Sequence, residues 1–347
     1  MARKAAKPPS DTIEDAAWRS DPDVVRRFLA IRPRYEELCN EVTYILKKRV
    51  QQAGVAVATV SARAKTLGSY LQKIEPKSYQ NPFHEVTDFA GVRVVCLYKS
   101  GLQKVRRIVR EEFEVVEELN KFDQMGVDRF GYGAWHFIVR LGTESAGARY
   151  DDLKALVCEV QVRTVVQDAW AIIQHHLVYK KESEVPGQIQ RALNALAGQF
   201  EGVDDQFDNL RKQREKYRAG VRSNPKLASI PLNLDSFTEY LGRWFPGRQK
   251  EGYDGQLRLV FDKLLAAGVK TVGQVDKAIH RSKADRTKLF SEFGLSDIRK
   301  TMDGRVPASL DALFAVALAT PTDLTVYRFN SRWKAAVESY RQRSVTG

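Results

Sequence analysis

The chain has 347 residues, of which 43% are hydrophobic and 29% charged, and its formal net charge is +13 with a pI near 9.5. These values are typical of a folded protein large enough for two domains, and they exclude a low-complexity chain. No apolar run approaches the roughly 20 residues of a membrane-spanning helix, so we expect no membrane partner. The basic excess favours a polyanionic partner, a nucleotide or nucleic acid, although a solvated basic surface is the alternative.

The start of the chain and the cysteines indicate a reducing compartment. Residues 1–11 are basic with no apolar segment behind them, which predicts a disordered arm and not a secretory signal. Cys39, Cys96 and Cys158 are odd in number, widely spaced and in mostly apolar surroundings. We therefore expect buried, reduced thiols in a cytoplasmic protein.

The first half of the chain alternates between helical and extended patterns. Residues 12–53 predict helix, with an apolar face over 33–53 that ends at Gly54. Residues 55–65 predict a strand that leads into a short helix. The stretch HEVTDFAGVRVVCLY (84–98) predicts a buried strand, which is followed by a helix over about 101–118 and a loop over 120–131.

The second half begins with two alternating stretches, GAWHFIVRL and LVCEVQVRT, which predict strands. Helical spacing follows over 165–181 and again over 186–217. Beyond a polar linker at about 221–229, the sequence predicts helices only. We therefore predict an α/β (α+β) fold, a mixed β-sheet flanked by helices, plus a C-terminal all-α domain. The predicted order is an arm at 1–11, a catalytic domain at 12–220, a linker at 221–229 and a helical accessory domain at 230–347.

Charged residues in the predicted buried strands are the first candidates for chemistry. Asp88 and Arg93 lie in 84–98, and Glu159 lies in CEVQVRT. A desolvated charge is costly unless it is paired or binds a ligand. Two carboxylates on two central strands suit a divalent metal such as Mg²⁺. The alternative is a pair of structural ion pairs, Asp88–Arg93 and Glu159–Arg163, but buried ion pairs add little net stability.

Basic residues cluster just before this region, in RAKTLGSYLQK. Arg63 begins the cluster, and the spacing of Lys65, Ser69 and Lys73 can place them on one helical face. Such a face suits a triphosphate, whose charge must be neutralised during transfer. A solvated helix face is the alternative.

The stretch FGYGAWHF (130–137) is the third candidate. Tyr132 lies between two glycines, which leaves its ring room to stack on a base. Four residues on, His136 could donate to a phosphate at the same site. The alternative is a turn followed by core aromatics.

In order, the stretches RAKTLGSYLQK, TDFAGVRVV, GYGAWH and EVQVRT…WAIIQHHLVYK resemble the successive motifs of the RelA/SpoT synthetase family. The later VPGQIQRALNALAGQFEGVDDQF is similar to that family's closing helices, so the resemblance covers about residues 35–217. It implies a nucleotidyltransferase-like mixed sheet. It also implies transfer of pyrophosphate from ATP to the 3′-hydroxyl of GDP or GTP, which gives the alarmone (p)ppGpp.

The resemblance assigns a role to each matching residue. On the ATP side it implies phosphate contacts from the basic cluster and adenine stacking by Arg93; the ATP-binding set is Arg63, Lys65, Ser69, Lys73 and Arg93. Asp88 would bind Mg²⁺, and Glu159 would sit at the 3′-hydroxyl as metal ligand or base. The acceptor side would comprise Tyr132, His136 and Asp168.

The acceptor side departs from the family pattern. Gly133 and Ala134 stand where the family usually has Arg and Ser, and Asp168 stands where small synthetases often have Asn. Two alternatives therefore stay open: a toxin-like enzyme that pyrophosphorylates the tRNA 3′ end or an adenosine nucleotide, and a catalytically dead nucleotide-binding scaffold. No histidine is directly followed by an aspartate, and the family's hydrolase site needs such a His-Asp pair, so we expect no hydrolase activity. The C-terminal domain could serve a protein regulator, a homo-oligomer or tRNA.

Overall fold

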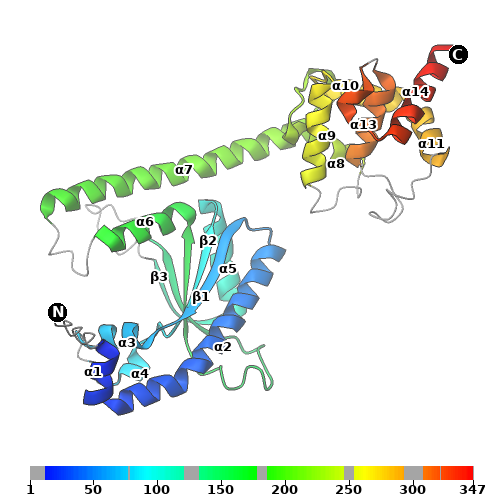
Figure 1. The fold of residues 1–347 in the computed structure, drawn as a ribbon. Coiled ribbons are helices and arrows are strands. Elements are labelled where there is room, and N and C mark those ends of the chain that lie inside the picture. The colour runs from blue at the N-terminus through cyan, green and yellow to red at the C-terminus, as the bar shows by residue number, and fades with distance from the viewer. Residues whose placement is uncertain are drawn as a thin grey trace, which may run out of the picture. The chain divides into compact units, whose positions relative to one another are not determined.

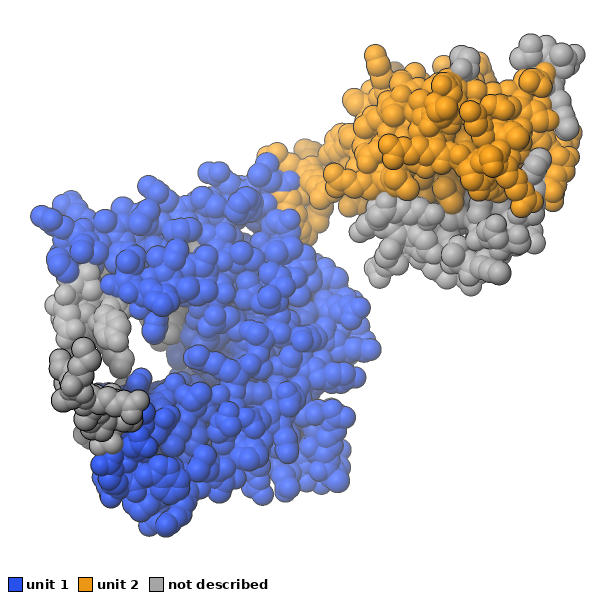
Figure 2. All heavy atoms as spheres, viewed as in Figure 1, with its two compact units in different colours: residues 1–210 blue, residues 211–347 orange. Residues whose placement is uncertain are grey.

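The computed structural model describes residues 12–76, 79–120, 133–177, 186–245, 254–292, 308–320 and 322–346. The chain forms two compact units, residues 1–210 and residues 211–347, drawn in blue and orange in Figure 2. Each unit has its own hydrophobic core. None of the described helices is both long and apolar enough to cross a membrane.

A mixed five-stranded sheet organises the first unit (Figure 1). Its strands are β1 (Val57–Ala64), β2 (Ala90–Cys96), β3 (Phe113–Asn120), β4 (Trp135–Leu141) and β5 (Cys158–Thr164), in the spatial order β1-β2-β5-β4-β3. The central pair β2–β5 is parallel, and the other three pairs are antiparallel. The predicted mixed sheet flanked by helices is confirmed.

One face of this sheet is the core face. It packs against helices α2 (Pro22–Gln52) and α5 (Lys99–Glu112), and α1 (Ile13–Ser20) precedes them. Buried residues on this face include Leu38, Leu46, Val105, Val94 and Val160. The predicted helical stretch over 12–53 is confirmed except at Asp21, whose non-helical backbone separates α1 from α2. Its end has the expected cause, because Gly54 adopts φ of +60°.

The opposite face carries the polar residues, because neighbouring positions in a strand alternate between faces. In β5, for example, Cys158, Val160 and Val162 are fully buried while Glu159 and Gln161 are half-buried. Helices α3 (Leu67–Ile74), α4 (Pro82–Glu85) and α6 (Val165–Leu177) complete the unit, together with α7 (Gly187–Ser223) up to Leu210. The ring of Trp170 in α6 packs against α7 in a small second cluster.

Two predicted elements differ from the structure. The predicted helix over 101–118 ends at Glu112, and Phe113–Asn120 forms β3, because it pairs with β4 and buries Phe113. Ion pairs from Arg106 and Arg110 to Glu118 compensate the acidic residues there. Asp88 precedes β2 and does not lie within it, because α4 occupies residues 82–85 and the strand begins only at Ala90.

The second unit is helical in its described residues, as predicted. Its elements are a 3₁₀ turn (Leu227–Ser229), α8 (Leu234–Trp244), α9 (Asp254–Ala266), α10 (Val272–Arg281), α11 (Lys283–Glu292), α13 (Ala308–Ala319), a 3₁₀ turn (Leu324–Tyr327) and α14 (Ser331–Thr346). Thr271 caps α10 with a full capping box. The predicted linker at 221–229 is wrong in its first part. There α7 continues to Ser223, because Val221 is buried in the second core.

Candidate active site

Polar side chains on the open face of the sheet form two rows across the strands. Strand register aligns Ser61 with Arg93, Arg93 with Gln161, and Gln161 with His136. The neighbouring row runs from Arg63 through Gly91 to Glu159. The sheet thus brings together side chains that lie up to 100 positions apart in the sequence.

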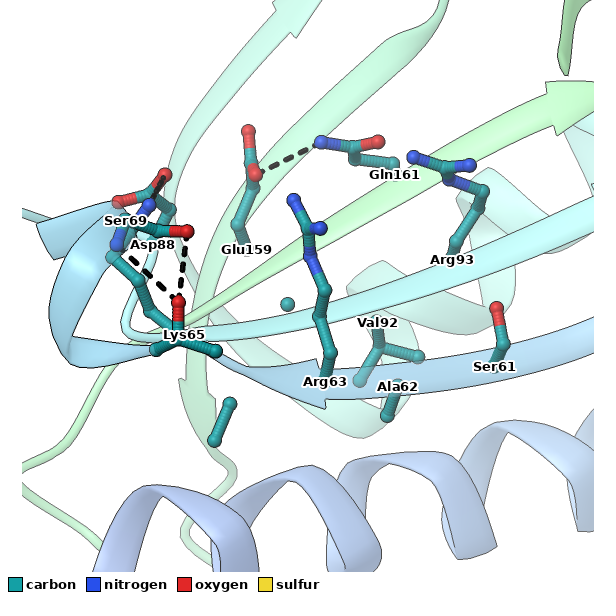
Figure 3. A pocket seen from close by; sticks show the side chains of 13 residues that line it. Ser61, Ala62, Arg63, Lys65, Ser69, Asp88, Val92, Arg93, Glu159 and Gln161 are labelled. Atoms are coloured by element: carbon teal, nitrogen blue, oxygen red, sulfur yellow. Dashed lines mark hydrogen bonds and ion pairs between the residues drawn. The ribbon is translucent and has the colours of Figure 1, made fainter. Parts of the chain in front are cut away.

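These rows form the floor and wall of a cavity of about 220 Å³. The lining residues are Ser61, Ala62, Arg63, Ala64, Lys65, Thr66, Ser69, Asp88, Gly91, Val92, Arg93, Glu159 and Gln161. Figure 3 shows the side chains of Arg63, Arg93 and Glu159 on the same side of the sheet, each from a neighbouring strand. Basic and acidic groups predicted separately from three motifs therefore share one site.

Asp88 lies at one end of the cavity between two lysines. Lys65 Nζ is 2.9 Å from Oδ2, and Lys73 Nζ is 2.8 Å from Oδ1. The backbone N–H of Lys65 also donates to the carbonyl of Phe89 at 2.8 Å, which fixes the end of β1 beside the Asp88 segment. Burial by itself would raise the pKa of Asp88. Hydrogen bonds from Lys73 and Lys65 outweigh this, so the pKa lies below its ordinary value of 3.8.

The predicted shared helical face for the basic cluster is only partly correct. Ser69 and Lys73 lie in α3, but Lys65 lies before the helix, whose N-cap is Thr66. Ser69 belongs to this cap, because its N–H and hydroxyl both contact the Thr66 hydroxyl. The two lysines converge on Asp88 nonetheless, and the cap places Ser69 in the cavity wall.

Glu159 is held by two neighbours on its own face of the sheet. Its Oε1 is 2.8 Å from Nδ1 of His136, and its Oε2 accepts a hydrogen bond of 2.9 Å from Gln161 Nε2. His136 was predicted to contact phosphate, and its Nε2 is buried without a hydrogen-bond partner in the described part of the chain. We did not predict Gln161. Its position two residues after Glu159 in a strand was the available signal.

Arg93 and Asp168 form the other end of the site. Nη1 of Arg93 donates to Oδ1 of Asp168 at 2.9 Å, and Nη1 of Arg163 lies 3.7 Å from the same oxygen. Asp168 was predicted to bind the acceptor, and here it contacts an ATP-side residue. Asp88 and Arg93 thus have separate partners, which excludes the Asp88–Arg93 ion pair considered from the sequence. Tyr132 lies outside the described residues.

The donor atoms fit a magnesium ion in part. Asp88 and Glu159 both present carboxylates to the cavity, and Mg²⁺ is usually held by one or two carboxylates together with substrate phosphates. No group of three or more His, Cys, Asp or Glu residues that could hold a metal occurs in the described ranges. A metal here would therefore need further oxygen ligands from a bound phosphate or from water.

Comparisons with known proteins agree with the motif order. Residues 62–184 match the family model described as a region found in RelA / SpoT proteins. The chain is 26% identical over 172 residues to the GTP pyrophosphokinase YjbM of Bacillus subtilis, covering 48% of this chain and 78% of the relative. It is 25% identical over 157 residues to the GTP pyrophosphokinase YwaC of the same organism, covering 44% and 72% respectively.

Solved structures are similar as well. Small alarmone synthetase 1 from B. subtilis bound to its product pppGpp has 22% identity and a TM-score of 0.45, covering 56% of this chain and 98% of that chain. A GTP pyrophosphokinase family protein from Streptococcus pneumoniae has 20% identity and a TM-score of 0.47, covering 55% and 96%.

Proposed function

The chain belongs to the RelA/SpoT synthetase family through residues 62–184, and from this premise we propose which reaction its first unit performs. The unit is a pyrophosphokinase-type transferase. In our proposal it moves the β,γ-pyrophosphate of ATP to the 3′-hydroxyl of GDP or GTP and releases AMP. Both curated relatives named above are GTP pyrophosphokinases, which supports a guanine nucleotide as acceptor.

The observation that carries the proposal is the shared cavity. Arg63, Lys65 and Arg93 line the cavity and supply positive charge there. Lys73 is a fourth cation beside it, paired with Asp88 in the cavity wall. Phosphoryl-type transfer depends mainly on positioning and on neutralising the charge that spreads over phosphate oxygens. A cavity with several cations and two carboxylates matches that requirement.

Asp88 and Glu159 would hold Mg²⁺ in this cavity. The metal would neutralise phosphate charge during the transfer. Lys65 and Lys73 keep Asp88 ionised, as its lowered pKa shows, so its oxygens stay ready to act as ligands. ATP phosphates would then take over the lysine contacts.

Glu159 also fits the role of general base. In the reaction the 3′-oxygen forms a bond to the β-phosphorus of ATP while the bond from that phosphorus to the α,β-bridging oxygen breaks. The hydroxyl proton would pass to a Glu159 oxygen. His136 and Gln161 each contact one oxygen of Glu159, so they would fix the direction in which the carboxylate faces.

Cellular context and direction of reaction complete the proposal. All three cysteines are free and buried, as in proteins of reducing compartments, which supports a cytoplasmic location. The sequence lacks a His-Asp pair, which supports synthesis without hydrolysis.

Labelled pyrophosphate transfer tests the proposal. The full chain is incubated with γ-labelled ATP, Mg²⁺ and, separately, GDP, GTP, AMP, ADP, ATP or bulk tRNA. We expect labelled guanosine product with GDP or GTP, one AMP per transfer, and no product from Glu159→Gln. A labelled product derived from AMP, ADP, ATP or tRNA, with none from GDP or GTP, would overturn the acceptor assignment. No transfer to any acceptor by folded protein would overturn the activity.

A further inference from the structure

The positive charge of the chain is concentrated in its second unit. Residues 211–347 contain 26 Lys and Arg against 14 Asp and Glu, a formal net charge of +12, while residues 1–210 contain 30 against 29. Almost the whole excess of +13 therefore lies outside the unit that holds the transferase cavity. An excess of this size favours a polyanionic partner for the second unit itself.

Several acidic side chains of the second unit are already engaged within it. Arg286 and Asp311 form a buried ion pair at 2.6 Å. The carboxylate of Glu239, only 7% exposed, accepts hydrogen bonds from Arg218 and Arg222, one at each oxygen. These carboxylates therefore do little to neutralise cations elsewhere on the surface of the unit.

The exposed side of α10 is a row of such cations. Gln274, Lys277 and Arg281 follow one another at spacings of three and four, so they lie on one side of the helix, while the other side packs into the second core. Lys270 joins the row, because its backbone N–H donates to the Gln274 side chain at 2.6 Å. Lys270, Lys277 and Arg281 are exposed, and in the described residues their side chains make no hydrogen bond or ion pair. We call these three residues the α10 cations.

Two of the α10 cations border a cavity of about 210 Å³. Lys277, Arg281 and Gln274 line it from α10, and Thr320 lines it from the residue after α13. Its other lining residues in the described part of the chain are small or apolar, such as Ala278, and none is acidic. A hollow with two cations and no anion suits a phosphate group.

An exposed aromatic ring lies beside the same helix. Trp244, at the end of α8, is 44% exposed, and its ring centre lies 5.6 Å from that of His280 in α10. The guanidinium carbon of Arg243 is 5.9 Å from the Trp244 ring centre. His280 directly precedes Arg281, so the indole and the α10 cations belong to one surface. Aromatic rings set among cations are typical of surfaces on which bases stack while phosphates meet Lys and Arg.

We propose that the second unit binds single-stranded nucleic acid, with phosphates at the α10 cations and a base stacked on Trp244. A duplex fits less well, because its bases are stacked on one another and cannot reach the indole face. An acidic protein would meet the same cations but would leave Trp244 without a planar partner. The surface shares no residue with the transferase cavity, so this binding does not depend on the proposed reaction.

Fluorescence anisotropy of the full chain tests this in the absence of ATP. Labelled RNA and DNA strands of mixed sequence, about 20 nucleotides long, are compared with the duplex at several salt concentrations. We expect a single strand of either kind to bind more tightly than the duplex. For single strands, each phosphate contact adds about 0.7 to the slope of log affinity against log salt. Lys277→Ala/Arg281→Ala should therefore lower that slope by about 1.4 and weaken binding at low salt at least about tenfold.

Two further variants separate this surface from general charge. Arg34→Ala/Lys48→Ala removes the same charge from exposed positions of α2 in the first unit and should change neither affinity nor slope. Trp244→Ala should weaken binding about 5- to 150-fold with an unchanged slope, because stacking releases no counterions. Wild type that binds no single strand overturns the proposal. So do equal losses in the two double variants, tighter binding of the duplex, or polyglutamate that competes as well as RNA.

Discussion

Arg93 of β2 and Asp168 of α6 are joined by a hydrogen bond of 2.9 Å across 75 positions of the chain. Their side chains are 35% and 20% exposed, so the pair is only partly screened by water. The contact holds the Arg93 guanidinium in one orientation at the edge of the cavity. Asp168 was predicted from its place in the motif to bind the acceptor, but its hydrogen bond goes to Arg93, a residue predicted to bind ATP.

From this pairing we predict that Asp168→Ala weakens the binding of a non-hydrolysable ATP analogue, as Arg93→Ala does. The two effects should not add. In a double-mutant cycle measured by calorimetry we expect a coupling of about 0.5–3 kcal/mol, the range for residues in direct contact. Glu114→Ala is the control, since it breaks the Arg140–Glu114 ion pair between β3 and β4 and should leave analogue affinity unchanged. Additive effects would show that Asp168 does not act through Arg93.

The two cavity carboxylates give a second prediction. Asp88→Ala and Glu159→Ala should each lower the pyrophosphate transfer rate by about 10³-fold or more, because each removes an oxygen needed at the reacting phosphate or hydroxyl. Gln161→Leu should lower the rate by a smaller factor, because it removes only one of the two contacts that orient Glu159. Folding is checked by circular dichroism. More than about a tenth of the activity in either alanine variant would contradict the assigned site.

Most of the site was predictable, because local sequence determines which side of a strand a residue faces. Glu159 was predicted as a charge in a buried strand, and the alternation in CEVQVRT explains why it faces away from the core; the same alternation would have found Gln161. What sequence alone could not supply is the partner of each charge. Asp88 meets Lys65 and Lys73 only because the strand β1 and the helix α3 return to the same edge of the sheet.

The missed strand has a similar cause. FEVVEELN continues the charged character of the preceding helix, and local propensity does not exclude helix there. Pairing with β4 and the ion pairs to Glu118 make it β3. Tertiary contacts therefore decided between two conformations that the sequence permits.

Gly91 gives a third prediction, because it leaves space in the floor of the cavity between Arg63 and Glu159. A Cβ atom at Gly91 would meet only the Arg63 carbonyl oxygen, at 3.8 Å, so a side chain would fit the fold but project into the cavity. We expect Gly91→Val to keep the melting temperature and to lower ATP-analogue affinity at least about tenfold, about 1.4 kcal/mol. Gly101→Ala should lower the melting temperature and leave ATP-analogue affinity unchanged, since its Cβ would lie 3.2 Å from Cys96 Cβ in the core. If Gly91→Val binds the analogue normally, the analogue does not occupy this cavity.

The lowered pKa of Asp88 predicts how the first unit responds to acid. The carboxyl titrates below 3.8 when folded and near 3.8 when unfolded, so folding favours its ionised form. This contribution is fully present above pH 3.8 and is lost as the pH falls through the folded-state pKa. The stability difference between wild type and Asp88→Asn should therefore shrink as the pH falls from neutral to that range. Calorimetric melting at several pH values measures it, and a difference that stays constant or grows would mean that the lysine pairs do not stabilise the fold.

The contacts of α7 predict where the chain can be cut. A chain ending at Asn224 keeps all of α7, including Asp204 at the Thr164 hydroxyl and Asp208 at the Ser100 N–H. We expect it to fold and to bind the ATP analogue with Mg²⁺, although it exposes Val221, which is buried in the second core.

A chain ending at Gly202 loses both aspartates and leaves their donors without these acceptors. A hydrogen bond to a charged group contributes about 1.5–3 kcal/mol, so loss of both should make this chain less stable than the Asn224 chain by several kcal/mol in urea unfolding. Asp204→Ala/Asp208→Ala in the full chain should reproduce much of that loss with no change in length. Equal stability of the two truncated chains would show that α7 does not support the first unit. An insoluble Asn224 chain would show that the two units depend on one core.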